Sequence, residues 1–168
     1  MKRLLAASVI AILPSMALAQ MPEMKLLSLI EAVEAVEQKV PGHVIEADMD
    51  HEKGRYVYDI EVVKDNDLSK VKLDAQTGEI ISIRKSWLKN TWREIWNSDY
   101  YKLPGVIKPL SETLKRIEQD TTGQIRKVDF DVEGNVAHYE IEVISAAGET
   151  DIYLDARTGE RLPAAYSD

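Results

Sequence analysis

The sequence has no cysteine among its 168 residues. It therefore forms no disulfide, offers no thiolate ligand to a metal and no thiol nucleophile, and has no cysteine to which a lipid could be attached. Basic residues are also outnumbered by acidic ones, 21 against 29, for a formal net charge of −8. Because binding to nucleic-acid phosphates needs a basic surface, this balance argues against a nucleic-acid partner.

Long apolar runs are absent after the first 20 residues, so we expect no stable insertion into a membrane. Those 20 residues read MKRLLAASVIAILPSMALAQ, with a short basic start, an apolar run over 4–13 and small residues at 17–19. This is the pattern of a secretory signal peptide. We expect cleavage near Ala19 and a periplasmic or secreted mature chain.

Motifs that carry chemistry are scarce as well. No Gly-rich phosphate loop occurs, and no serine lies in the glycine-flanked turn of a hydrolase nucleophile. The three histidines, His43, His51 and His138, do not form a metal-binding pair at helical spacing. An enzyme is therefore the least favoured class, and no cofactor is expected.

What the sequence does contain is an internal repeat. Residues 29–81 align with residues 110–162 without a gap, and 18 of the 53 aligned positions are identical. The phrase LDAQTGEI at 73–80 recurs as LDARTGER at 154–161. Duplication of one structural unit is the simplest explanation.

Each copy predicts a helix first. In the first copy, apolar residues recur at helical spacing over 26–40, and Pro41-Gly42 ends the helix. In the second copy, a shorter apolar stripe spans 110–117, Ser111 is the expected N-cap, and Gly123 ends the helix.

Strands follow the helix in each copy. Apolar and acidic residues alternate over 56–63 and again over 139–143, as expected for a half-buried antiparallel strand. Two shorter strands are expected at 71–73 and 80–83. The expected fold class is α+β, with two tandem units, each one helix packed on a small antiparallel sheet.

The repeated phrase Asp-Ala-x-Thr-Gly-Glu lies between two strand patterns. Asp74 can accept hydrogen bonds from backbone groups two residues on, and Gly78 can adopt the positive φ that closes a hairpin. Asp155 and Gly159 can do the same in the second copy. We interpret the phrase as turn architecture in preference to a metal or catalytic site.

These motifs together resemble the PepSY domain family. The resemblance is carried by a helix starting near Leu-Ser, then Pro-Gly, then Tyr-x-Ile-Glu-Val, then Leu-Asp-Ala-x-Thr-Gly-Glu, and it covers about 27–83 and 108–164. The second copy has Thr122-Gly123 where the first has Pro41-Gly42. The expected organisation is a signal peptide at 1–19, one unit at 24–83, an aromatic helical linker at 84–108 and a second unit at 109–164.

The resemblance implies a helix against a curved antiparallel sheet and a non-catalytic role. PepSY domains occur in propeptides of thermolysin-like metallopeptidases, and they are thought to inhibit peptidases or regulate their activity locally. No catalytic domain follows in this sequence, so any peptidase or other protein or peptide partner is expected to be met in trans. The family carries no shared catalytic residues.

One acidic stretch has the spacing of a calcium loop. DFDVEGNVAHYE, residues 129–140, places four carboxylates and a glycine at loop positions. The candidate ligands are Asp129, Asp131, Glu133 and Glu140. Strand-like alternation on the flank favours a polar hairpin, with weak cation binding left open there and at the matching Asp48, Asp50 and Glu52.

Residues 84–108 hold all three tryptophans, and this segment is the candidate partner-binding surface. One interpretation is a connecting helix whose aromatic face packs between the two units. Another is a binding surface, since Trp, Tyr and Arg are enriched at binding hot spots, and a membrane-surface helix is a third. The candidate contact residues are Trp87, Trp92, Arg93, Trp96, Tyr100 and Tyr101.

Three hypotheses follow for the function. The favoured one is an exported, non-catalytic binding or regulatory protein that modulates a peptidase or an envelope partner in trans. The alternative is a periplasmic protein that binds a small ligand or a cation at its acidic hairpins. The third, an enzyme, lacks any matched nucleophile, base or metal cluster.

Overall fold

The structure, a computed structural model, describes residues 25–65, 67–87, 108–133 and 136–163. In this part of the chain two helices and seven strands occur. Their bounds are α1 (Leu29–Lys39), β1 (His43–Glu52), β2 (Arg55–Lys64), β3 (Asp67–Asp74), β4 (Ile80–Trp87), α3 (Leu110–Asp120), β5 (Gln124–Glu133), β6 (Val136–Ser145) and β7 (Gly148–Asp155).

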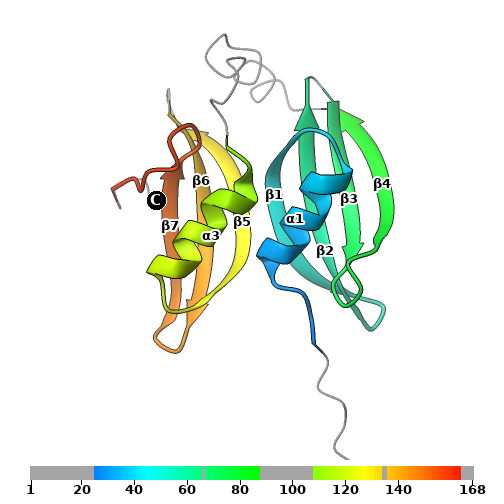
Figure 1. The fold of residues 1–168 in the computed structure, drawn as a ribbon, viewed down its shortest axis with the longest axis horizontal. Coiled ribbons are helices and arrows are strands. Elements are labelled where there is room, and N and C mark those ends of the chain that lie inside the picture. Colours follow the sequence, from blue (N-terminus) through cyan, green and yellow to red (C-terminus); the bar gives the residue numbers. More distant parts are fainter. Residues whose placement is uncertain (1–24, 66, 88–107, 134–135, 164–168) are drawn as a thin grey trace, which may run out of the picture.

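All seven strands form one antiparallel sheet in the order β4-β3-β2-β1-β5-β6-β7. Both helices lie side by side on the same face of this sheet (Figure 1). The expected α+β class is confirmed, but the expected pair of separate small sheets is wrong. Strand β1 of the first repeat pairs with β5 of the second, so the two repeats share one sheet.

The junction between the repeats, called the seam below, is the β1–β5 pairing. It consists of three opposed residue pairs, Glu46 with Asp129, Ala47 with Val128, and Asp48 with Lys127. Ala47 and Val128 are fully buried beneath the helices. The seam therefore has an apolar side that joins the two cores, and a polar side on the face without helices.

The hydrophobic core runs across the seam. One cluster of buried side chains includes Val33 and Val36 of α1, Leu114 of α3, and Ile60 and Ile141 of the matching strands β2 and β6. Burying each such side chain contributes roughly 1.5–3 kcal/mol. Because the cluster is continuous, each repeat completes the core of the other.

Polar contacts also join the two helices. The Ser111 side chain donates a hydrogen bond to Glu37 of α1, and Lys115 forms an ion pair with Glu34. The expected role of Ser111 as N-cap is wrong, because α3 begins at Leu110 after Pro109, with no side-chain cap. In contrast, α1 has a complete capping box formed by Ser28 and Glu31.

Gly42 and Gly123 occupy matching positions where each helix turns into the next strand. A methyl group at Gly42 would lie 2.5 Å from the carbonyl oxygen of Val63, and one at Gly123 would lie 2.7 Å from that of Ile144. Gly42 also has φ of 139°. Glycine is thus required at this site of the repeat because the backbone of the second strand passes too close for a side chain.

Candidate functional site

The repeated Asp-Ala-x-Thr-Gly-Glu phrase forms the same turn in both copies. The Asp74 carboxylate accepts hydrogen bonds from the backbone N–H groups of Gln76 and Thr77, each at 2.9 Å. Gly78 has φ of 71°, and its N–H donates to the Asp74 carbonyl. The prediction of turn architecture is confirmed for the first copy.

Asp155 repeats this arrangement in the second copy. Its carboxylate accepts from the N–H groups of Arg157 and Thr158 at 2.9 and 2.8 Å, and Gly159 has φ of 68°. A helix side chain reaches the turn in each copy, since Lys39 donates to the Gly78 carbonyl and Arg116 to the Gly159 carbonyl. The turn thus anchors helix to sheet.

Hydrogen bonding also sets the charge state of the first turn. Donation from the Thr77 and Gln76 backbone N–H groups lowers the pKa of Asp74 from its ordinary value, because these bonds favour the carboxylate. Asp74 therefore remains ionised and engaged in the turn, a poor position for proton transfer or metal binding.

The face of the sheet without helices carries a row of carboxylates across the seam. Strand register places Glu61 of β2 opposite Glu46 of β1, Glu46 opposite Asp129 of β5, and Asp129 opposite Glu140 of β6. We call these four residues the seam row. Like charges opposed in neighbouring strands repel one another, so the row costs stability unless something compensates it.

Basic side chains neutralise some carboxylates of the seam row and not others. Lys70 forms an ion pair with Glu61, and Lys127 lies 2.6 Å from an oxygen of Asp129. Glu46 has no ion pair among those found in the described chain. Burial raises the pKa of Glu46, and the neighbouring carboxylates of Glu61 and Asp129 raise it further.

A groove of about 360 Å³ continues from the seam row over β1, β2 and β3. Basic side chains from β3 and β4 border it on one side. The acidic residues that line it are Glu46, Asp48, Asp50, Glu52, Asp59 and Glu61. The surface is therefore polar, predominantly acidic, and formed by regular strands that hold each carboxylate in a fixed register.

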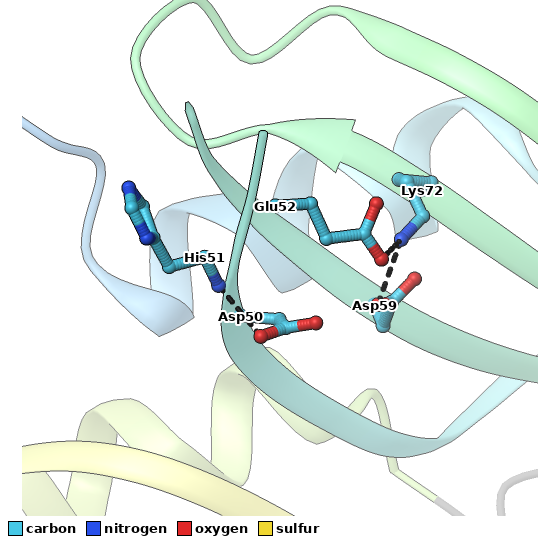
Figure 2. A network of polar contacts seen from close by, with 5 residues as sticks. All are labelled: Asp50, His51, Glu52, Asp59 and Lys72. Atoms are coloured by element: carbon cyan, nitrogen blue, oxygen red, sulfur yellow. Dashed lines mark hydrogen bonds and ion pairs between the residues drawn. The ribbon is translucent and has the colours of Figure 1, made fainter. Parts of the chain in front are cut away.

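Three carboxylates in this groove lie close enough together to hold one metal ion. Ligand atoms of Asp50, Glu52 and Asp59 lie within 4.8 Å of one another. Figure 2 shows Lys72 reaching the group from β3, and its ammonium nitrogen lies 2.6 Å from Glu52 and 3.0 Å from Asp59. Lys72 thus supplies the positive charge that an ion would otherwise supply.

The four calcium-loop candidates are spread along the β5–β6 hairpin. Asp129 lies opposite Glu140, whereas Asp131 lies opposite His138 and Glu133 opposite Val136. In an extended strand, alternate residues are roughly 6.6 Å apart, so the backbone does not curl successive carboxylates around one ion as a calcium loop does. The register brings Asp129 and Glu140 together and leaves Asp131 and Glu133 further along.

The aromatic candidates lie mainly outside the described residues. The structure does not describe Trp92, Arg93, Trp96, Tyr100 and Tyr101. Trp87 is the last residue of β4, but its side chain is not described. The expected linker helix over 84–108 falls in the same segment, except that residues 84–87 belong to strand β4, where the helix was expected. No helix in the described ranges is long and apolar enough to cross a membrane.

Reading the chain residue by residue missed the seam row. Its members belong to four strands of two repeats, and only the β1–β5 register places them together. A signal was present, since Glu46, Asp48, Asp50 and Glu52 alternate with less polar residues over 45–52, which is the period of a strand. We interpreted Asp48, Asp50 and Glu52 as a turn, but they lie within β1.

Comparison with curated protein sequences gave no match. Among solved structures, the chain is similar to a Clostridium difficile 630 protein described as a "putative lipoprotein", with 19% identity and a TM-score of 0.45, covering 84% of this chain and 94% of that one. It is also similar to the YpmB protein from Bacillus subtilis, with 18% identity and a TM-score of 0.34, covering 79% and 91%.

The model of one protein family, described as the peptidase propeptide and YPEB domain, matches the chain twice. The matched residues are 26–84 and 108–162, one region in each repeat. Both regions include the turn, the paired strands and the helix whose geometry is given above. The chain therefore belongs to the PepSY family and contains two tandem copies of its domain.

Proposed function

We propose that this protein is an exported, non-catalytic binding or regulatory protein that engages a basic segment of a protein partner with the seam row and adjoining groove. Family membership supports the general role, because PepSY domains are propeptide-like regulatory domains and are generally non-catalytic. The partner class we favour is a peptidase or another envelope protein met in trans.

The observation that carries this proposal is the seam row itself. Four carboxylates stand in register across the junction of two repeats, where electrostatic repulsion opposes sheet formation. A fold gains nothing internally from such a row, whereas a basic partner would relieve the repulsion on binding. Complementary charges also accelerate association and favour the correct partner.

Two further features belong to the proposal. The signal peptide at 1–19 would deliver the chain to the periplasm or the exterior, where the partner is met. The segment at 84–108, between units at 24–83 and 109–164, would supply aromatic contacts through Trp92 and Trp96 in addition to the acidic surface.

Affinity capture with matched variants tests the proposal. The mature chain, residues 20–168, is immobilised and exposed to the exported proteins of its own source, alongside a Glu46→Gln/Asp129→Asn variant. A Glu118→Gln/Asp120→Asn variant changes the net charge equally but alters exposed acids of α3, on the other face of the sheet. Retained proteins are identified by mass spectrometry.

The expected result is a protein retained by the wild type and by the α3 variant, released by salt, and lost from the seam variant. Equal retention by all three would refute the acidic face as the contact surface. If only a Trp92→Ala/Trp96→Ala variant fails to retain the partner, the contact surface is the aromatic segment at 84–108.

Cation binding is the second candidate function, favoured by the proximity of Asp50, Glu52 and Asp59. Calorimetry with calcium, zinc and iron tests it on the wild type and on a Lys72→Gln variant, in which the carboxylates lose their internal cation. The same titration covers the Asp129–Glu140 pair. Absence of heat and of a thermal shift at millimolar metal in both proteins would dispose of this function.

A further inference from the structure

The line of charges that forms the seam row continues, with its sign reversed, over the two outer strands of the first repeat. Register places Lys70 of β3 opposite Glu61, and Arg84 of β4 opposite Lys70. The β3–β4 pairing is regular here, since its register shift lies between Lys72 and Leu73. Strands β4, β3, β2 and β1 lie next to one another (Figure 1), so one line across the groove runs from two cations to two acids.

The two middle charges of this line neutralise each other, whereas the two end charges do not. Lys70 forms an ion pair with Glu61. Arg84 lies opposite Lys70, so the two cations repel each other, and none of the ion pairs of the described residues involves Arg84. Glu46 also has no such pair and stands between the carboxylates of Glu61 and Asp129. The groove thus holds an uncompensated cation at β4 and an uncompensated anion at β1.

Opposite charges at the two ends select the chemistry of a ligand. A segment that carries only basic groups would relieve the repulsion at Glu46 but would be repelled by Arg84. Guanidinium groups bind carboxylates with two parallel hydrogen bonds, the geometry in which arginine binds most strongly. A ligand that satisfies both ends therefore carries a cationic group for Glu46 and a carboxylate for Arg84.

The spacing of the strands sets the length of that ligand. Three steps between neighbouring strands separate β1 from β4. Each step is roughly 4.8 Å, so the two ends lie about 14 Å apart. An extended chain advances roughly 3.4 Å per residue, so about four residues span this distance. The groove volume of about 360 Å³ is within the range of ordinary ligand sites, roughly 300–1,000 Å³.

We propose that the segment bound in this groove is extended and zwitterionic, with a basic side chain on Glu46 and a carboxylate, about four residues further on, at Arg84. This inference rests on the proposed function and narrows its basic partner segment to one that also carries a negative charge at a defined distance. A C-terminal carboxylate and an acidic side chain supply the same chemistry, and the choice of peptides separates them.

Three synthetic peptides test the proposal, each titrated into the mature chain at low salt and followed by backbone amide chemical shifts. The first is acetyl-Lys-Ser-Gly-Ser-Gly with a free C-terminal carboxylate. The second has the same sequence with a C-terminal carboxamide, and the third is the carboxamide with glutamate in place of the last glycine. Whichever carboxylate Arg84 accepts should tighten binding roughly two- to fivefold over the second peptide.

The variant Arg84→Gln should abolish the difference between the peptides. Lys85→Gln is the matched control, because it removes the same charge from the next residue of β4, whose side chain points to the other side of the sheet. Glu46→Gln should weaken binding of all three peptides. All three substitutions change half-buried or exposed side chains, and circular dichroism confirms that each variant is folded.

The outcomes separate this inference from the function on which it rests. Equal binding of the three peptides, or a preference for the carboxylate that persists in Arg84→Gln, would overturn the zwitterionic segment. The acidic contact surface would still stand if Glu46→Gln weakened binding. Binding that is insensitive to Glu46→Gln, or no binding of any peptide at millimolar concentration, would overturn both.

Discussion

Replacing Glu46 with glutamine should stabilise the protein at neutral pH. Glu46 is half-buried beside the seam, between the carboxylates of Glu61 and Asp129. Glutamine keeps the shape of the side chain and removes its charge, so the apolar side of the seam is left undisturbed. The change isolates the electrostatic cost of the seam row.

The magnitude follows from the two opposed carboxylates. Each like-charged pair across neighbouring strands costs roughly 0.2–1 kcal/mol, so removing both gives about 0.4–2 kcal/mol of added stability. Ion pairs of Glu61 with Lys70 and of Asp129 with Lys127 weaken the repulsion, which favours the lower half of this range. For a chain of this size, 1 kcal/mol raises the melting temperature by about 2–4 °C.

The stability gained by the Glu46→Gln variant must depend on pH in a defined direction. The pKa of Glu46 is raised above its ordinary value of 4.5 in the folded chain. Folding therefore favours the protonated acid, and the wild type loses stability as pH rises through the folded pKa. The advantage of Glu46→Gln should accordingly be full at neutral pH and disappear as pH falls below 4.5.

Thermal unfolding followed by circular dichroism, at a series of pH values, provides the measurement. Glu118→Gln is the matched control, because Glu118 is exposed on α3 and faces no acid of the seam row. A destabilised Glu46→Gln variant, or a gain that persists unchanged at low pH, would show that the carboxylates of the seam row do not repel one another in the folded chain.

Three other substitutions should reduce stability, each measured by urea unfolding. Gly42→Ala should cost about 1–3 kcal/mol, because its methyl group would meet the Val63 carbonyl at a positive φ; an unchanged midpoint would contradict the close approach. Asp155→Ala should lower the midpoint by removing the acceptor for two backbone N–H groups, and an Asn replacement should recover part of the loss. Tyr139→Phe should cost about 0.5–1.5 kcal/mol, because the Tyr139 hydroxyl donates a hydrogen bond to the Val44 carbonyl across the repeats; a neutral result would contradict that contact.

Local structure could be predicted from local sequence. The helix from Leu29 and the turn at Asp74 each depend on residues a few positions apart, so their signals are complete within one window. The hairpin strands around 56–63 and 139–143 were also predicted, since alternation of apolar and acidic residues is strong there.

The merging of the two repeats could not be predicted in this way. The contact between Ala47 and Val128 joins residues far apart in sequence, and no periodicity specifies which strand edge meets which. Strand β1 was missed because its acids were assigned to a turn. Ser111 was misassigned because its true partner, Glu37, belongs to the other repeat.

The seam is the feature on which the acidic surface and its proposed partner depend. Nuclear Overhauser contacts between backbone protons of Ala47 and Val128 test the β1–β5 pairing directly in the mature chain. The corresponding contacts between strands within each repeat serve as the reference. We expect cross-strand contacts there, together with contacts between Glu46 and Asp129. If contacts within β1–β2 and β5–β6 are observed and those across β1–β5 are absent, the two repeats form separate sheets and the seam row does not exist.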